Sequence, residues 1–215
     1  FGLPGAVSGE ALRDLQEALI FMPEHLSWYQ LTIEQGTAFA QNPPTLPEHD
    51  AICDDYDKGL EYLLCAGFKH YEVSSYAKEG YVSRHNLNYW KFGDYIGIGA
   101  GAHGKRTIED GFVRTTKIRH PRRYMNAARR GRVRESEKVS RGSTRVSEFM
   151  LNVLRLRSGF TLDQFEKRTG LPAEAIERPM DAAVGNGWVE RRRGRICPTA
   201  TGFRFLNDLQ LLFLD

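Results

Sequence analysis

The spacing of apolar residues along the first hundred positions alternates between two patterns. Residues 26–33 and 71–76 are rich in β-branched and aromatic side chains, and residues 26–33 alternate in polarity, which predicts two strands. Two longer stretches carry apolar residues three or four positions apart, which predicts helices after Ser8 and from Asp50 to Cys65. The expected inward residues are Ala11, Leu12, Leu15, Ala18 and Leu19 in the first helix, and Ile52, Tyr56, Leu60, Leu63 and Leu64 in the second, which Gly67 ends.

This alternation of helix and strand is typical of parallel strands covered by helices. We therefore predict an α/β fold in which residues 1–105 form the C-terminal portion of a partial, TIM-like parallel barrel. Such barrels carry their chemistry at the C-terminal ends of the strands. Thr32 and Glu34 lie at one of these ends, and the segment after Tyr76, which includes His85, follows the next.

The pattern becomes mainly helical near residue 141. Apolar spacing predicts helices that begin near Ser143, Thr161 and Pro172, followed by two short strands around residues 191–194 and a last helix from Thr201. Three helices and a basic hairpin in this order predict a winged-helix-like domain. The expected division is an α/β barrel part at 1–105, a hairpin and basic helical connector at 106–140, and a winged-helix-like domain at 141–215.

Composition is typical of a cytoplasmic globular protein. Of the 215 residues 41% are apolar, and no run approaches the roughly 18 apolar residues that span a bilayer. Three scattered cysteines argue against a disulfide framework. The net charge of +3 is unevenly distributed: residues 1–80 hold 4 basic and 13 acidic side chains, whereas residues 81–215 hold 26 and 14. Such a split usually means a solvated basic face, but it can also mark an anionic partner: porphyrin propionates, an acidic protein, a membrane surface or nucleic acid.

One short segment concentrates side chains that could bind a planar, metal-containing ligand. Residues 84–90 read RHNLNYW. Histidine is the commonest metal ligand and a usual axial ligand of haem iron, and Tyr and Trp offer flat apolar faces with a polar tip. From the residues alone, a histidine that simply packs in the core or at the surface is the favoured explanation of the segment. The candidate ligand-binding residues are His85, Asn86, Asn88, Tyr89 and Trp90.

The glycine-rich run that follows, GDYIGIGAGAHG at 93–104, contains a literal G-x-G-x-x-G. A dinucleotide-binding loop of this kind opens a helix. Here an Asp110-Gly111 turn and the β-rich residues 112–116 follow instead, which predicts a hairpin. We therefore expect the glycines to allow close approach of backbone to backbone, or of backbone to a cofactor.

Segment 84–90 and its glycine run resemble the HemW-type haem chaperones, which are radical-SAM proteins related to oxygen-independent coproporphyrinogen III oxidase. GLPG at 2–5, HLSWYQLTIE at 25–34 and NDLQLLFL at 207–214 also resemble that family, in the same order. The resemblance implies a protein that holds haem and delivers it to an acceptor protein. It also implies that His85 ligates the iron, with Asn86, Asn88, Tyr89 and Trp90 around the haem.

The same family carries a Cys-x3-Cys-x2-Cys motif that holds a [4Fe-4S] cluster, and this motif is absent here. Because the chain also begins at Phe1, we expect a fragment of a longer protein, without radical chemistry of its own. S-adenosylmethionine and [4Fe-4S] are then expected in the full-length protein only. The residues expected near its S-adenosylmethionine pocket are Thr32, Glu34, Gly99 and Gly101.

Two alternatives stay open. The coproporphyrinogen oxidase of the same superfamily lacks the HNxxYW stretch, so its presence favours the chaperone. A winged-helix DNA-binding regulator would place the hairpin arginines on phosphates. However, Glu174, Glu177 and Asp181 in the third helix disfavour a nucleic acid, and Pro179 must kink that helix or shift its boundary. Cys197-Pro198 also matches a dipeptide of haem-regulated proteins, but a strand end followed by a turn explains it better.

Overall fold

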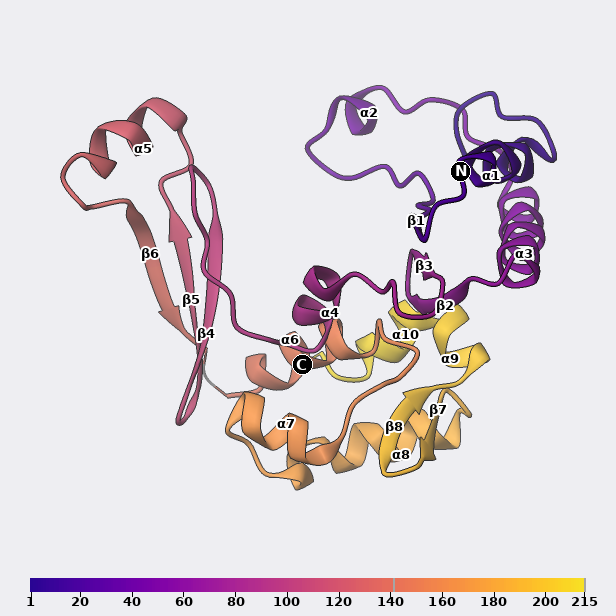
Figure 1. Cartoon of the computed structure of the whole chain (residues 1–215). Helices are drawn as coiled ribbons and strands as arrows, with labels where there is room; N and C mark the ends of the chain where they lie inside the picture. Colours follow the sequence, from indigo (N-terminus) through magenta and orange to yellow (C-terminus); the bar gives the residue numbers. More distant parts are fainter. Residues whose placement is uncertain (141, 215) are drawn as a thin grey trace. The chain divides into compact units, whose positions relative to one another are not determined.

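The computed structural model describes residues 1–140 and 142–214 and forms two compact units, Phe1–Ser83 and Arg84–Asp215 (Figure 1). Each unit has a sheet and an apolar core of its own. Among the described residues, no helix is both long and apolar enough to cross a bilayer. The three-part division at residues 105 and 140 stays a prediction.

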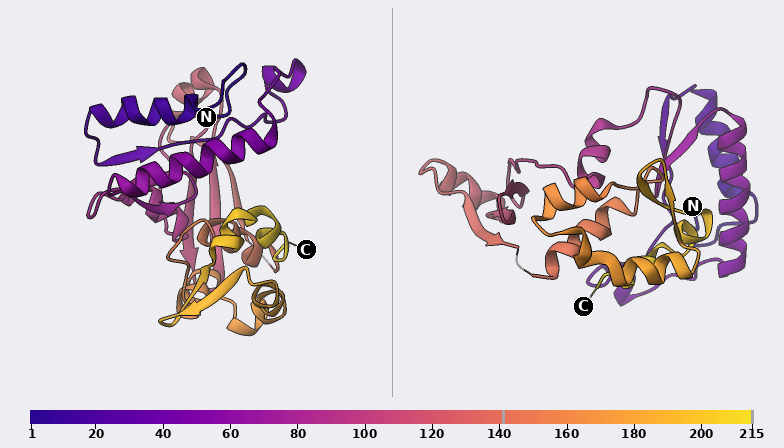
Figure 2. Two further views of the ribbon diagram at one scale, coloured as in Figure 1. Left: turned by 90° about the vertical axis from the view of Figure 1, so that its right-hand side faces the viewer. Right: turned by 90° about the horizontal axis from the view of Figure 1, so that it is seen from below.

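The N-terminal unit packs two amphipathic helices beside a small sheet. Helices α1 and α3 run side by side (Figure 2), and Leu15 and Leu63 from their inner faces join Trp28 and Tyr76 in one buried cluster. The Trp28 ring packs directly against the backbone of α3 at Gly59, because a Cβ there would lie 2.1 Å from the ring. The elements of this unit are α1 (Glu10–Ile20), β1 (His25–Ser27), α2 (Ala38–Gln41), α3 (His49–Cys65), β2 (Lys69–Glu72) and β3 (Ser75–Ala77).

The strands of this sheet run antiparallel in the order β1-β3-β2, so the parallel pairing expected from the sequence is wrong for them. Only Val73 and Ser74 separate β2 from β3. Two residues can close a hairpin, whereas parallel neighbours need a crossover of a dozen residues or more. The single strand expected at 71–76 is therefore two strands, and the strand expected at 26–33 ends at Ser27.

Two smaller expectations for this unit also fail. The helix expected directly after Ser8 begins one residue later. The residue before α1 is Gly9, with a left-handed φ of 80°, and no side chain caps the helix. Leu64 is 50% exposed, because α3 turns that position away from the apolar cluster. The other end of α3 follows the prediction: Gly67, at a φ of 84°, stops the helix.

The C-terminal unit begins with a helix and a three-stranded antiparallel sheet, β4-β5-β6. The hairpin predicted at Asp110-Gly111 is confirmed. Strand β6 was not predicted, since its sequence RESEKV shows no apolar alternation. The basic helix expected in the connector is confirmed as α5. The elements are α4 (Arg84–Trp90), β4 (His103–Ile108), β5 (Gly111–Lys117), α5 (Pro121–Ala128) and β6 (Arg134–Val139).

The remaining residues form a helical module with a hairpin. In its core Phe149 meets Phe160 and Phe165 edge to face, and Phe92 and Phe112 extend that core to the sheet. Helix α8 begins at Glu177 after a 3-10 turn, so Pro179 lies in its first turn, where no intrahelical hydrogen bond is lost. The elements are α6 (Thr144–Val153), α7 (Leu162–Thr169), the 3-10 turn η1 (Ala173–Ile176), α8 (Glu177–Gly185), β7 (Val189–Arg192), β8 (Arg195–Pro198), α9 (Ala200–Arg204) and α10 (Leu206–Leu211).

Candidate functional site

Helix α4 carries all five candidate residues of segment 84–90. The helix has only seven residues and buries none of them. His85 is exposed, and its ring meets the edge of Tyr89 at a centroid distance of 4.8 Å. Tyr89 in turn meets Tyr95, beyond the helix, at 4.5 Å. These three rings form a continuous aromatic ladder, with the imidazole at its free end.

The other end of the ladder is fixed by an arginine. Nη1 of Arg114, on β5, donates to Oη of Tyr95 at 2.8 Å. Nε and Nη2 of the same guanidinium donate to Oε2 of Glu148 on α6, at 2.9 and 2.8 Å. Arg114 therefore connects the ladder to the helical module.

Asn88 and Trp90 hold α4 in place. Nδ2 of Asn88 donates to the Asp94 carbonyl at 3.0 Å. Gly93 lies so close that a Cβ there would be 2.2 Å from Oδ1 of Asn88. The Trp90 ring lies 4.4 Å from the Arg155 guanidinium, while its Nε1 is buried without a partner among the described residues. Asn86 lies half-buried on the same helix.

A buried charge supports the turn after α4. The Lys105 amine donates to the Phe92 carbonyl at 3.0 Å, to Oδ1 of Asp94 at 3.1 Å and to Thr107 at 3.3 Å. It also lies 4.1 Å from the centre of the Phe92 ring. Burial lowers the pKa of Lys105 below its ordinary 10.5, and the Asp94 carboxylate opposes that shift. No sequence pattern singled out this residue, since a lysine in a polar strand is usually exposed.

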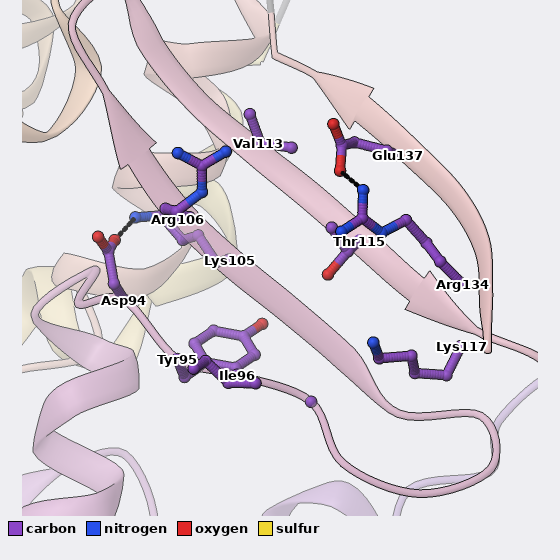
Figure 3. Close-up of a pocket in the computed structure, with 11 residues that line it drawn as sticks. Asp94, Tyr95, Ile96, Lys105, Arg106, Val113, Thr115, Lys117, Arg134 and Glu137 are labelled. Carbon is purple, nitrogen blue, oxygen red and sulfur yellow. Dashed lines mark hydrogen bonds and ion pairs between the residues drawn. The ribbon is translucent and has the colours of Figure 1, made fainter. Parts of the chain in front are cut away.

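The sheet separates two different surfaces. Directly paired residues share a face, so Tyr95, Lys105 and Arg114 lie on one side, toward α4. Residues of the other face, together with Asp94, Tyr95 and Lys105, line an open cavity of about 480 Å³ (Figure 3). Its cations include Arg106, Lys117 and Arg134, of which Arg134 pairs with Glu137.

The remaining candidate residues lie elsewhere. The Gly99 amide donates to Oη of Tyr124 at 3.2 Å, and the Gly101 amide donates to the Ile118 carbonyl at 3.0 Å. Both glycines have positive φ, at 105° and 70°. Thr32 and Glu34 are exposed on irregular chain after β1, in the N-terminal unit. Their roles near a cofactor stay predictions.

The arrangement at α4 suits haem better than it suits a multi-ligand metal ion. Within the part of the chain that the structure describes, no three His, Cys, Asp or Glu side chains gather to hold a metal. Haem iron, whose porphyrin supplies four nitrogens, needs only an axial ligand from the protein. The exposed His85 imidazole can supply it, the tyrosine rings offer apolar surface, and Trp90 Nε1 is a buried donor that lacks a partner among the described residues.

Comparison with known proteins gives a consistent result. The HemN C-terminal domain family matches residues 143–205. The chain is 46% identical to the heme chaperone HemW of Escherichia coli (strain K12) over 214 residues, which are 99% of this chain and 56% of that protein. It is 42% identical to the heme chaperone HemW of Haemophilus influenzae, over 99% of this chain and 55% of that protein.

The fold is also similar to a solved structure. The chain matches coproporphyrinogen III oxidase (HemN) from Escherichia coli, described as a radical SAM enzyme, with a TM-score of 0.73. The match covers 99% of this chain and 53% of that one, at 14% identity, and therefore concerns the fold alone. The chain thus spans little more than half the length of the relatives it matches.

Proposed function

We propose, from the likeness to heme chaperones HemW over 99% of the chain, that this chain is part of a HemW-type protein, binds haem through His85 and passes the haem to an acceptor protein. The observation that carries this proposal is the exposed imidazole at the end of the aromatic ladder on α4. Bound haem would supply an iron with a free axial position, for which a neutral imidazole is a usual ligand.

The contacts around α4 suggest different roles for the five candidate residues. Tyr89 supports the imidazole from the side and presents a ring face to the porphyrin. Asn88 holds the turn through the Asp94 carbonyl, and Trp90 packs against Arg155. Among the described residues, Tyr89 is the one ring in contact with His85, which is exposed and can approach a ligand from solvent and release it again. An exposed ligand of this kind favours delivery of haem over permanent storage.

Several finer points belong to the same proposal. S-adenosylmethionine and the [4Fe-4S] cluster would be held by the longer protein, with Thr32, Glu34, Gly99 and Gly101 near them. The barrel interpretation then concerns that longer protein, and the helices and hairpin of residues 141–215 support a winged-helix-like domain. We propose a cytoplasmic location, with a haem-acceptor protein or a membrane surface as partner. The oxidase stays the alternative: the HemN C-terminal domain family matches residues 143–205, whereas the structural likeness at 14% identity concerns the fold alone.

A haem titration followed by absorbance tests this proposal. Wild type should shift the Soret band at about one haem per chain, and His85→Ala should lose that shift. His103→Ala is the matched control, because His103 is an exposed histidine of the same unit that makes no ring contact with the ladder among the described residues. Equal binding by all three proteins would mean that haem only adheres to apolar surface, and loss in His103→Ala alone would move the ligand to the glycine run.

A further inference from the structure

Arg114 and Glu148 join the haem-binding helix to the helical module. Glu148 lies on α6, inside the matched segment 143–205, and Arg114 lies on β5. Two nitrogens of the guanidinium bind one carboxylate oxygen, and the third binds Oη of Tyr95. Because the guanidinium is a rigid planar fork, fixing two nitrogens at Glu148 aims the third at Tyr95.

We propose that the Arg114–Glu148 pair positions His85 through Tyr95 and Tyr89, so that the helical module sets the geometry of haem ligation. This inference rests on the proposed function of His85. Arg114 and Glu148 are positioning residues, since neither is assigned contact with the haem.

The need for such support follows from α4 itself. A helix of seven residues is not stable in isolation, and this one buries none of its side chains. An imidazole that ligates iron keeps its orientation only when neighbouring groups hold it. Among the described residues, the ring contact recorded for His85 is with Tyr89, and Tyr89 is backed by Tyr95. The orientation of the imidazole therefore depends on where Tyr95 is held.

The ion pair between Arg114 and Glu148 is partly buried. The two side chains are 30% and 29% exposed, so the pair is neither sealed in the core nor free in solvent.

Three variants separate the parts of this connection. Tyr95→Phe removes only the hydroxyl, Glu148→Gln removes the charge that holds Arg114, and Arg114→Lys keeps a charge without the fork. Glu137→Gln is the control, because it breaks an Arg ion pair of the same sheet on the face away from α4. Haem affinity is measured by Soret titration, and the ligand geometry by electron paramagnetic resonance of the ferric complex.

Each of the three variants should bind haem about tenfold more weakly than wild type, as expected for a lost charge-assisted hydrogen bond. Their resonance lines should change from one ligand geometry to a mixture, whereas a smaller folded fraction would lower only the amplitude. The double variant Arg114→Lys/Glu148→Gln should bind haem no more weakly than the weaker-binding of the two single variants, because both substitutions act through Tyr95.

The outcomes distinguish this inference from the function on which it rests. Wild-type affinity and line shape in all three variants, with binding that still requires His85, would overturn the positioning role and leave the proposed function intact. The positioning role would also be overturned if the three variants changed haem affinity and line shape no more than Glu137→Gln does. Haem binding by His85→Ala with the same affinity as wild type would overturn both the positioning role and the proposed function. Tyr95→Phe keeps the test decisive if the charge variants fold poorly, since it keeps the ring.

Discussion

At the scale of single residues, the site depends on a charge that lies inside the core. The side chain of Lys105 is 1% exposed, and that of Asp94, its partner, is 40% exposed. Asp94 accepts hydrogen bonds from the Thr107 amide at 2.9 Å and from its hydroxyl at 2.7 Å. Burial raises the pKa of Asp94, but hydrogen bonds from Thr107 and Lys105 outweigh this and leave it below the ordinary 3.8. The ionised form of Asp94 therefore stabilises the fold.

Asp94→Asn should destabilise the chain by about 2 kcal/mol at pH 7, because it leaves the Lys105 ammonium buried without its counter-charge, a cost reduced by the exposure of Asp94. A carboxylate whose pKa is lowered in the folded state contributes its full stability above pH 3.8 and loses it as the pH falls through the folded value. The difference in free energy of unfolding between wild type and Asp94→Asn, measured in urea, should thus shrink as the pH falls below 3.8. A constant difference down to pH 2.5 would contradict this account of Asp94.

Asp163→Asn is the matched control for that measurement. Asp163 pairs with Lys167 one turn along α7, and both side chains are about 70% exposed. Surface pairs of this kind contribute about 0.5 kcal/mol or less. If Asp163→Asn lowered the free energy of unfolding as much as Asp94→Asn, the burial of Lys105 would not explain the effect of Asp94→Asn.

At the scale of elements, sequence and structure agree closely at the two ends of α7. Thr161 precedes α7, and its Oγ1 accepts from the Gln164 amide at 3.0 Å, while Gly170 ends the helix at a φ of 66°. Ser143 precedes α6 but makes no side-chain cap. Local chemistry determines such ends, so the sequence alone could indicate them.

Thr161→Ala should lower the free energy of unfolding by about 1 kcal/mol, the usual cost of a lost N-cap. Ser143→Ala should change it by less than about 0.5 kcal/mol, because no cap bond is lost. Urea unfolding followed by circular dichroism measures both. Equal effects would mean that the observed cap bond does not stabilise α7.

Strands were predicted less well, for reasons that particular segments make clear. The pairing of β1 with β3 joins residues about fifty positions apart, and no local pattern reports which strand lies next to which. Residues 71–76 contain a turn at Val73-Ser74 without the Gly or Asn that usually marks one. Strand β6 is almost wholly polar, so its place beside β5 depends on pairing and not on burial.

The candidate site shows the same division between local and distant information. Residues 84–90 could be selected from the sequence, because their types carry the chemistry. The supports at Arg114, Glu148 and Lys105 could not, because each comes from another element and acts through a contact across the fold. Resemblance to a family suggested His85 as the ligand, and the structure added the contacts around its helix.

At the scale of the whole chain, charge follows the division into two units. Residues 81–83 are uncharged, so Phe1–Ser83 carries the 4 basic and 13 acidic side chains of residues 1–80, and the rest of the chain carries 26 and 14. The residues that line a cavity of about 650 Å³ include Arg123 of α5 and, from the loop after it, Arg129, Arg130 and Arg132. Such a surface attracts polyanions at low salt whether or not they are its partner.

We nevertheless expect no specific binding to DNA. The helix that would enter a major groove is α8, and it carries Glu177 and Asp181, with Glu174 just before it. Fluorescence anisotropy with a labelled random duplex at about 150 mM salt should show no saturable binding, since a purely electrostatic interaction weakens steeply with salt. Saturable binding under these conditions would support the regulator alternative.

The central claim, that His85 holds the haem iron, is tested most directly by chemical rescue. His85→Ala should lose the electron paramagnetic resonance signal of an imidazole-ligated ferric haem, and added free imidazole should restore it, because the position is open to solvent. Haem with imidazole but without protein provides the blank, and His103→Ala should keep the wild-type signal without imidazole. Contradiction would come from a His85→Ala protein that shows the wild-type signal before any imidazole is added.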